Sequence, residues 1–213
     1  MIVYGPGLSP YVRKVLAFAA EKGIAVEHNA NTNGPNADPA FRQASPFGKI
    51  PALKDGDFTL SDSSAIVAYL EKLKSDPALF PADAQGLGRA VWLEEFGDDL
   101  LGGPTVRIFF NRIVAKMIGM EGNPEIADKA EKEELPRAFA YLESVAPASG
   151  FLIGDSLSIA DIAVASPCAN LSVMNLLPDA STYPKAAAWL ARIFARPSFA
   201  TLMDADKAFL AAH

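Results

Sequence analysis

The sequence opens with MIVYGPGLSPYVR (residues 1–13), and this stretch decides how the rest of the chain is interpreted. The apolar run Ile2-Val3-Tyr4 predicts a buried strand, and the Gly-Pro-Gly segment behind it predicts a turn. Ser9-Pro10 then predicts a helix start, because serine is a favoured N-cap and proline suits the first helical position. Unpaired N–H groups and the helix dipole favour an anion at such a place. Taken alone, Ser9 is better explained as a helix cap.

The first 75 residues predict the order β-α-β-α-β-β-α. Gly23 stops the first helix as a left-handed residue would, and Asp55-Gly56 predicts a hairpin with a type I′ turn. The first crossover should be parallel and right-handed and the hairpin antiparallel, which is a thioredoxin-like arrangement. The expected strands are 2–4 and 24–28, followed by a hairpin formed by the runs 47–54 and 57–60, in which Pro51 belongs at the start of a strand or on an edge. The expected helices are 10–22, 39–44 and one from Asp62-Ser63 to Leu73.

The composition indicates a soluble cytosolic protein with no nucleic-acid or membrane partner. The net charge is −6 and no basic cluster contradicts it, which argues against nucleic acid. The single cysteine, Cys168, excludes an internal disulfide framework and fits a reducing compartment. No secretory signal precedes Arg13 and Lys14, and the longest uncharged run, 162–178, contains Pro167 and predicts a broken buried helix.

Charge and composition divide the chain into two domains. We expect an α/β domain at residues 1–76, a Pro-, Asp- and Gly-rich linker at 77–88, and an all-helical domain at 89–213. Residues 1–80 carry eight basic and eight acidic side chains, whereas the remainder carries 11 basic and 17 acidic ones. The helical domain should contain helices at 89–101, 106–118, 124–145, 184–195 and 199–210, with an interruption at Gly102-Gly103-Pro104, a kink at Pro136 and a capping box at Ser158–Asp161.

Four motifs in this order resemble the cytosolic glutathione transferases. They are Ser9-Pro10-Tyr11 with Arg13, GKIPAL at 48–53, DSSAIVAYL at 62–70 and GDSLSIAD at 154–161. The resemblance covers nearly the whole chain. It implies a thioredoxin-like glutathione-binding domain, then an all-helical domain, and a homodimer. It also implies glutathione as co-substrate, a small electrophilic partner substrate and no metal.

The resemblance assigns roles to three residues around the thiol. Ser9 matches the catalytic hydroxyl of the serine-type members, whereas other classes place a cysteine there and perform thiol transfer. Ile50 would pair its backbone with the cysteinyl part of glutathione, next to Pro51, which is cis in the family. From the residues themselves, Ser9 would donate a hydrogen bond to the thiolate. A serine-nucleophile triad is excluded, because His28 and His213 are the only histidines and neither is near Ser9 in the expected fold.

The remaining glutathione contacts match less completely. Asp62 and Ser63 match the acidic-plus-serine pair that holds the γ-glutamyl amine and carboxylate, with aspartate one methylene shorter than the commoner glutamate. Lys49 matches a lysine that some classes use on the glycyl carboxylate. Several classes place Lys or His before the short second helix, where this chain has Asn36, Ala37 and Asp38. This departure removes one expected carboxylate contact.

Other residues have competing explanations. Tyr4 is a rival catalytic hydroxyl, but core packing is preferred for it, and Arg13 is explained equally as a site residue or as a solvated charge. The acceptor substrate of the family sits between the two domains, against the first two helices after the linker. The resemblance therefore makes Phe110, Arg112 and Tyr11 candidates, together with Phe96, Phe109 and Met117. For each of these, core packing or a dimer contact is an equal explanation. Trp92 and Trp189 are expected in the core.

Three functions are compatible with these residues. The first is a serine-type glutathione transferase that activates the thiol for attack on small apolar electrophiles. The second is a glutathione-dependent isomerase, dehalogenase or peroxidase, because the same thiolate serves all of these reactions. The third is a related protein that binds glutathione or apolar ligands without turnover. The first hypothesis leads, and detoxification in the cytoplasm is its expected setting.

Overall fold

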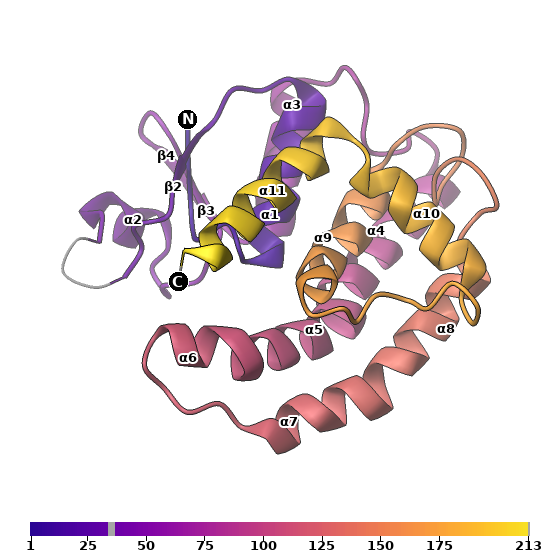
Figure 1. The fold of residues 1–213 in the computed structure, drawn as a ribbon. Helices are drawn as coiled ribbons and strands as arrows, with labels where there is room; N and C mark the ends of the chain where they lie inside the picture. The colour runs from indigo at the N-terminus through magenta and orange to yellow at the C-terminus, as the bar shows by residue number, and fades with distance from the viewer. Residues whose placement is uncertain (34–36, 213) are drawn as a thin grey trace. The chain divides into compact units, whose positions relative to one another are not determined.

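The computed structural model describes residues 1–33 and 37–212, and the chain divides into two compact units (Figure 1). The first unit is Met1–Leu79 and the second is Phe80–His213. Asn36, part of the expected departure from the family pattern, lies outside the described residues. Among the described residues, no helix combines the length and the apolarity needed to cross a membrane.

The first unit has the predicted order of elements around a four-stranded sheet. The strands are arranged β2-β1-β3-β4, with β1 parallel to β2 and antiparallel to β3, and with β3 antiparallel to β4. The predicted thioredoxin-like arrangement is therefore confirmed. The elements are β1 (Ile2–Tyr4), α1 (Pro10–Lys22), β2 (Glu27–Asn29), α2 (Pro39–Ala44), β3 (Ala52–Asp55), β4 (Phe58–Ser61) and α3 (Ser63–Leu73).

Two local predictions in this unit were wrong. The second strand begins at Glu27, not at Ile24, because the Ile24 N–H still donates to the Ala19 carbonyl as part of the C-terminal cap of α1. The hairpin pairs Asp55 with Phe58, so its two central residues are Gly56 and Asp57. Of these two only Gly56 has positive φ, which is the pattern of a type II′ turn and not of the predicted type I′ turn.

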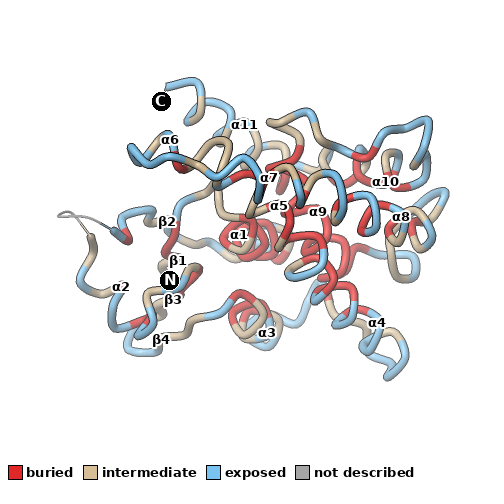
Figure 2. The backbone as a smooth tube through the Cα atoms, turned by 90° about the horizontal axis from the view of Figure 1, so that it is seen from below, coloured by how far each residue is buried: buried red, intermediate tan, exposed pale blue. Residues whose placement is uncertain are grey.

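The buried faces of α1 and α3 form the core of the first unit, and Figure 2 shows α1 coloured as buried along most of its length. Val12, Val15, Leu16 and Ala19 are all buried as predicted. Leu73, expected on the buried face of α3, is instead 51% exposed in the last helical turn.

A buried ion pair ties the end of α1 to the end of α3. Lys22 Nζ lies 2.6 Å from Glu71 Oε2 and donates to the Pro77 carbonyl at the same distance, and its side chain is fully buried. Glu71 in turn accepts from the Leu79 N–H at 3.3 Å. The segment that follows α3 is therefore fixed to the first unit through residue 79.

The second unit is entirely helical in its regular structure, as predicted. Its first helical stretch begins at Ala84, inside the range expected as linker, because Asp83 caps it by accepting from the Gly86 N–H. Its elements are α4 (Ala84–Glu95), η1 (Phe96–Leu101), α5 (Gly102–Phe109), η2 (Phe110–Val114), α6 (Ala115–Met117), α7 (Pro124–Lys129), η3 (Ala130–Glu134), α8 (Leu135–Val145), α9 (Ile159–Val173), α10 (Pro184–Phe194) and α11 (Pro197–Ala211), where η marks π-helical segments.

The predicted interruption at Gly102-Gly103-Pro104 was wrong, because helical structure continues from Ala84 to Met117. The π-helical segment η1 ends directly before Gly102. Pro104 has no N–H to donate to the preceding turn, and the hydrogen-bond pattern of that turn is already shifted by the wider π-helical spacing. The helix therefore continues through the proline. Pro136 likewise lies just after a π-helical segment, η3, and the helix continues through it without a break.

Helix α9 forms the centre of the second unit, and nearly all of its residues are buried. Pro167 lies inside α9 without ending it, which contradicts the predicted break. Because Pro167 has no N–H, the Ala163 carbonyl lacks its usual helical partner. Gly97 of η1 packs against this peptide, and a Cβ at Gly97 would lie 2.7 Å from the Ala163 carbonyl carbon.

The predicted capping box at the start of α9 is present. Asp161 Oδ2 accepts from the Ser158 N–H at 3.0 Å, and Oδ1 accepts from the Leu152 N–H and from Trp189 Nε1 at 2.8 and 2.9 Å. Burial raises the pKa of Asp161, against the lowering effect of these donors. Asp161 and the buried Trp189 thus serve the fold, as predicted for both.

Candidate functional site

Three chain segments meet at one edge of the sheet in the first unit. The register pairs Tyr4 with Ala52 and Ala52 with Ser61, so these residues form one row across β1, β3 and β4. Beyond this row β1 continues into the loop that reaches Ser9, β3 is preceded by Ile50-Pro51, and β4 continues into Asp62-Ser63. The sheet therefore brings together the three segments that the sequence predicted as a glutathione site.

Close contacts confirm that these segments are neighbours. Gly5 adopts φ +135°, and a Cβ there would lie 3.1 Å from Ile50 Cβ and 2.5 Å from Val12 Cγ2. Only glycine therefore fits where the loop after β1 passes Ile50. On the other side, Lys14 Nζ of α1 donates to Ser64 Oγ of α3 at 3.2 Å, which connects the second turn of α1 to the first turn of α3.

Ser9 caps α1 as the sequence predicted. Its backbone is extended, and its Oγ accepts from the Val12 N–H at 3.4 Å, which is a long hydrogen bond. The side chain is half-buried. Its hydroxyl proton has no acceptor within the described part of the chain. Ser9 can therefore donate a hydrogen bond outward at the positive end of a 13-residue helix.

Asp62 and Ser63 form the start of α3. Asp62 has φ +82°, a conformation that costs energy in a non-glycine residue, and its Oδ1 accepts from the Ser64 and Ala65 N–H groups at 2.9 and 3.1 Å. This capping holds the exposed Asp62 carboxylate at the helix N-terminus. Ser63 is buried beside it at the first helical position.

The segment before β3 offers an unused backbone edge. The Ile50–Pro51 peptide bond is cis, as the family resemblance implied. The N–H and carbonyl of Ile50 form no hydrogen bond with any described residue. Ser45 Oγ donates to the Lys49 carbonyl at 2.7 Å, so the segment is held from behind while the Lys49 side chain is exposed.

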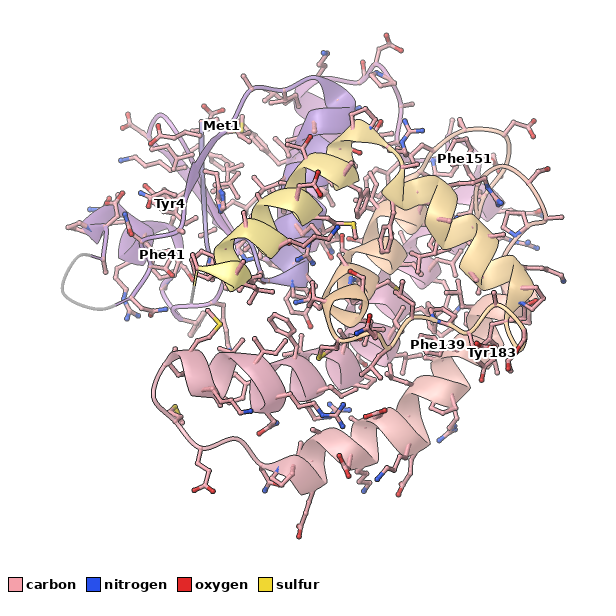
Figure 3. The ribbon with its side chains drawn as sticks, viewed as in Figure 1. Met1, Tyr4, Phe41, Phe139, Phe151 and Tyr183 are labelled. Atoms are coloured by element: carbon pink, nitrogen blue, oxygen red, sulfur yellow. The ribbon has the colours of Figure 1, made fainter. Side chains whose placement is uncertain are left out.

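Tyr4 and Arg13 are both placed by the structure. Tyr4 is buried and its ring packs 6.0 Å from that of Phe41, in the neighbourhood labelled in Figure 3. Burial raises the pKa of Tyr4, and a hydrogen bond to the Asp38 carboxylate adds to the increase. The preferred explanation of Tyr4 as a core residue is confirmed. Arg13 is 1% exposed, so its alternative explanation as a solvated charge was wrong.

Sequence reasoning missed a contact of His28 with the loop after β1. His28 Nε2 lies 2.7 Å from the Gly5 carbonyl oxygen, so the imidazole N–H donates to the loop that leads to Ser9. The sequence did contain an indication of this contact. The predicted parallel pairing of the strand at residues 2–4 with the strand that ends at His28 places this histidine close to the end of the first strand, where the loop begins. His28 thus supports the loop that leads to Ser9.

The acceptor-site candidates fall in different environments. Phe110 is 38% exposed, whereas Phe96 and Phe109 are buried, which favours core packing for the latter two. The Arg112 guanidinium lies 2.9 Å from Asp128 Oδ1 and 2.5 Å from Glu131 Oε2, so two carboxylates already compensate its charge. Tyr11 is half-buried near the start of α1.

The second unit contains a surface pocket of its own. Its volume is about 330 Å³, and Trp92, expected in the core, is 49% exposed at its wall. The Trp92 indole N–H donates to the Tyr141 hydroxyl. The lining residues are Trp92, Phe96, Leu100, Glu134, Arg137, Ala138 and Tyr141. In the described residues no cluster of three or more His, Cys, Asp or Glu side chains could bind a metal ion.

Comparison with known proteins agrees with this geometry. The model of the glutathione S-transferase N-terminal domain matches residues 3–78, and that of the C-terminal domain matches residues 99–197. The chain belongs to the glutathione S-transferase family. It is 30% identical over 205 residues to glutathione S-transferase 4 of Zea mays, covering 92% of this chain and 88% of that protein.

Solved structures of family members superpose over almost the whole chain. A glutathione S-transferase from Rhodospirillum rubrum F11 has a TM-score of 0.82 at 26% identity and covers 94% of this chain and 90% of its own. A second, from Methylobacterium radiotolerans in complex with glutathione sulfonate, has a TM-score of 0.76 at 26% identity and covers 95% and 93%. The recognition of the family and the predicted fold class are both confirmed.

Proposed function

We propose that this protein is a serine-type glutathione transferase in which Ser9 stabilises the thiolate of bound glutathione for attack on small apolar electrophiles. The observation that carries the proposal is the Ser9 hydroxyl, whose proton is uncommitted at the N-terminus of α1. In the proposed complex Ser9 donates to the sulfur. It acts neither as a nucleophile nor as a base.

The hydrogen bond from Ser9 and the N-terminus of α1 can together supply the free energy needed to stabilise the thiolate. A thiol with pKa near 8.5 is only a few per cent thiolate at neutral pH, and the thiolate is the nucleophile. Lowering that pKa by about two units requires about 2.7 kcal/mol of preference for the anion. A hydrogen bond to a charged group contributes about 1.5–3 kcal/mol, and a helix N-terminus adds about 0.3–1 kcal/mol. Ser9 and α1 together can supply this.

The other proposed contacts use the groups described above. The unused backbone of Ile50, next to Pro51, would pair with the cysteinyl residue. Asp62 and Ser63 would hold the γ-glutamyl amine and carboxylate, with the N–H groups of α3 favouring the negative charge. Lys49 would face the glycyl carboxylate, and Tyr11, Phe110 and Arg112 remain proposed contacts of the electrophile.

Titration of the thiol in the complex tests the proposal. The ultraviolet absorbance of the thiolate in bound glutathione should titrate about two pH units below that of free glutathione. Ser9→Ala should return the midpoint toward that of free glutathione and lose most turnover of an electrophile panel while retaining most glutathione binding. Tyr4→Phe is the matched control and should leave the midpoint unchanged. An unshifted midpoint in the wild-type protein contradicts thiolate activation.

The proposed setting is the cytoplasm, with detoxification of electrophiles as the role. A free cysteine that is buried and protonated, as Cys168 is, fits a compartment that keeps thiols reduced. The proposed assembly is a homodimer. Exposed apolar side chains on both units support it, since Phe47 is 88% exposed and Trp92 and Leu100 are each about half exposed beside the pocket.

A further inference from the structure

The side chain of His28 reaches from β2 to the loop that leads to Ser9. His28 pairs with Val3 in the parallel register, and its exposed imidazole extends to the Gly5 carbonyl beyond the end of β1, with Nε2 2.7 Å from the oxygen. Because a carbonyl oxygen can only accept, Nε2 carries the proton of this contact. The imidazole forms no other hydrogen bond within residues 1–33 and 37–212. This N–H is therefore committed to one backbone atom of the loop.

His28 supplies the donor that the sheet ladder lacks at Gly5. The Gly5 N–H donates to the Asn29 carbonyl at 3.0 Å, so in a continued parallel ladder the Gly5 carbonyl would accept from the Asn31 N–H. The Asn31 N–H instead donates to Asn29 Oδ1 at 2.9 Å, and β2 ends. Gly5 is buried, where a backbone carbonyl needs a partner. His28 is that partner.

The position of Gly5 is passed on to Ser9 through a short and rigid segment. The ring of Pro6 fixes its own φ and restricts the residue before it. The Pro6 carbonyl then accepts from the Ser9 N–H at 3.0 Å, which closes a tight turn over residues 6–9. The cap contact from the Val12 N–H to Ser9 Oγ is long, at 3.4 Å, and holds the hydroxyl only loosely. The loop that starts at Gly5 therefore determines where the Ser9 hydroxyl lies.

We infer that His28 is a positioning residue, which acts through the Gly5 carbonyl and the following turn to place the Ser9 hydroxyl against the sulfur of bound glutathione. This inference rests on the proposed function. A hydrogen bond weakens steeply as its geometry departs from the optimum, so a small displacement of Ser9 reduces its stabilisation of the thiolate. The Nε2–H is present in the doubly protonated ring and in the neutral ring that keeps its proton there, so the contact needs no charge on His28.

Titration of the bound thiol in two matched variants tests the inference. Glutamine places an amide N–H as many bonds from the backbone as His28 Nε2, whereas asparagine places it one bond short. His28→Asn should raise the midpoint of the thiolate absorbance by about 0.5–1 pH unit, which lowers the thiolate fraction at about pH 6 by about three- to eightfold. His28→Gln, which also carries no charge, should restore most of that shift. Asn31→Ala alters an exposed residue just beyond β2 and should leave the midpoint unchanged.

Turnover and binding distinguish positioning from a role in the fold alone. His28→Asn should lose turnover below neutral pH in proportion to the thiolate fraction, and should match the wild type above about pH 9, where both bound thiols are ionised. Its glutathione affinity at about pH 5.5, where both bound thiols are protonated, should stay within about twofold of the wild type. In a Ser9→Ala background His28→Asn should add no further shift of the midpoint, because both changes act through one hydroxyl.

The role of His28 is overturned by an unchanged midpoint in His28→Asn or by a shift that His28→Gln does not restore. It is also overturned by a loss of glutathione affinity at about pH 5.5 as large as the loss of turnover, because the variant would then have damaged the site as a whole. A wild-type midpoint equal to that of free glutathione instead overturns the proposed function on which the role rests.

Discussion

At the scale of single residues, the proposed ligand contacts are also helix caps. Ser9 accepts from Val12 at the start of α1, and Asp62 accepts from Ser64 and Ala65 at the start of α3. Loss of a side-chain cap costs about 0.5–2 kcal/mol of stability. Stability should therefore be measured alongside activity in every Ser9 or Asp62 variant, because a change in turnover can arise from either role.

Cys168 gives a residue-scale prediction about pH. Burial raises the pKa of the Cys168 thiol from 9.0 to about 12, so it should not react with thiol reagents in the folded protein at pH 8. The folded state keeps its proton between pH 9.0 and about 12, where the unfolded state has lost it. The contribution of this thiol to stability is therefore complete below pH 9 and falls as pH rises, by about 1.36 kcal/mol per pH unit.

Two measurements check this prediction. A chromogenic disulfide reagent should modify Cys168 only after urea unfolds the chain. Urea unfolding at several pH values between 9 and 11 should show a steeper loss of stability for the wild-type protein than for Cys168→Ala. Rapid modification of the native protein, or equal pH dependence of the two proteins, contradicts the assignment.

At the scale of elements, the contact of η1 with α9 depends on Gly97. A Cβ at Gly97 would lie 2.7 and 2.8 Å from the carbonyl carbon and oxygen of Ala163, which are backbone atoms that cannot rotate away. Gly97→Ala should therefore lower the free energy of unfolding by about 2–3 kcal/mol. Gly88→Ala in the neighbouring α4 meets no atom within 4 Å and should raise it by about 0.5–1 kcal/mol.

Chemical denaturation of both variants gives the measurement for this pair. The two substitutions add the same methyl group to one continuous helical stretch, so propensity affects both alike. A Gly97→Ala protein as stable as Gly88→Ala would mean that η1 and α9 can separate without cost.

The elements that the sequence predicted well are those with local signals. Ser9-Pro10 and Gly23 bounded α1 correctly, because capping depends on neighbouring residues along the chain. The interruption predicted at Gly102-Gly103-Pro104 failed, because a π-helical segment accommodates the proline and no short pattern signals such a segment. Glycine and proline lower the stability of a helix locally, and the packing around them decides whether the helix ends there or continues.

The site could be predicted only in part for a similar reason. The segments around Ser9, Ile50 and Asp62 carry motifs, and the register of the sheet brings them together. The close approach of Gly5 to Ile50 involves no motif, and it depends on how the loop after β1 passes the segment before β3. The burial of Arg13 and the exposure of Trp92 likewise result from tertiary packing, which composition along the chain does not reveal.

At the scale of the whole molecule, the proposed homodimer can be tested directly. Light scattering coupled to size exclusion should give twice the monomer mass at micromolar concentration. Leu100→Glu and Trp92→Glu place a charge on the exposed apolar wall of the pocket and should shift the mass toward the monomer. Leu87→Glu alters a 40% exposed leucine outside the pocket and serves as the control. A monomeric wild-type protein contradicts the proposed assembly.

The π-helical segments of the second unit also set the rotational phase of the helices that continue from them. Each residue advances an α-helix by about 100°, and a π-helical turn accommodates one additional residue without ending the helix. Deletion of one residue from η1 would let this turn return to regular α-helix, so Phe110 and Arg112 would keep their present orientation. Relatives that differ by a single residue in this stretch can therefore share one fold and the same downstream helix faces.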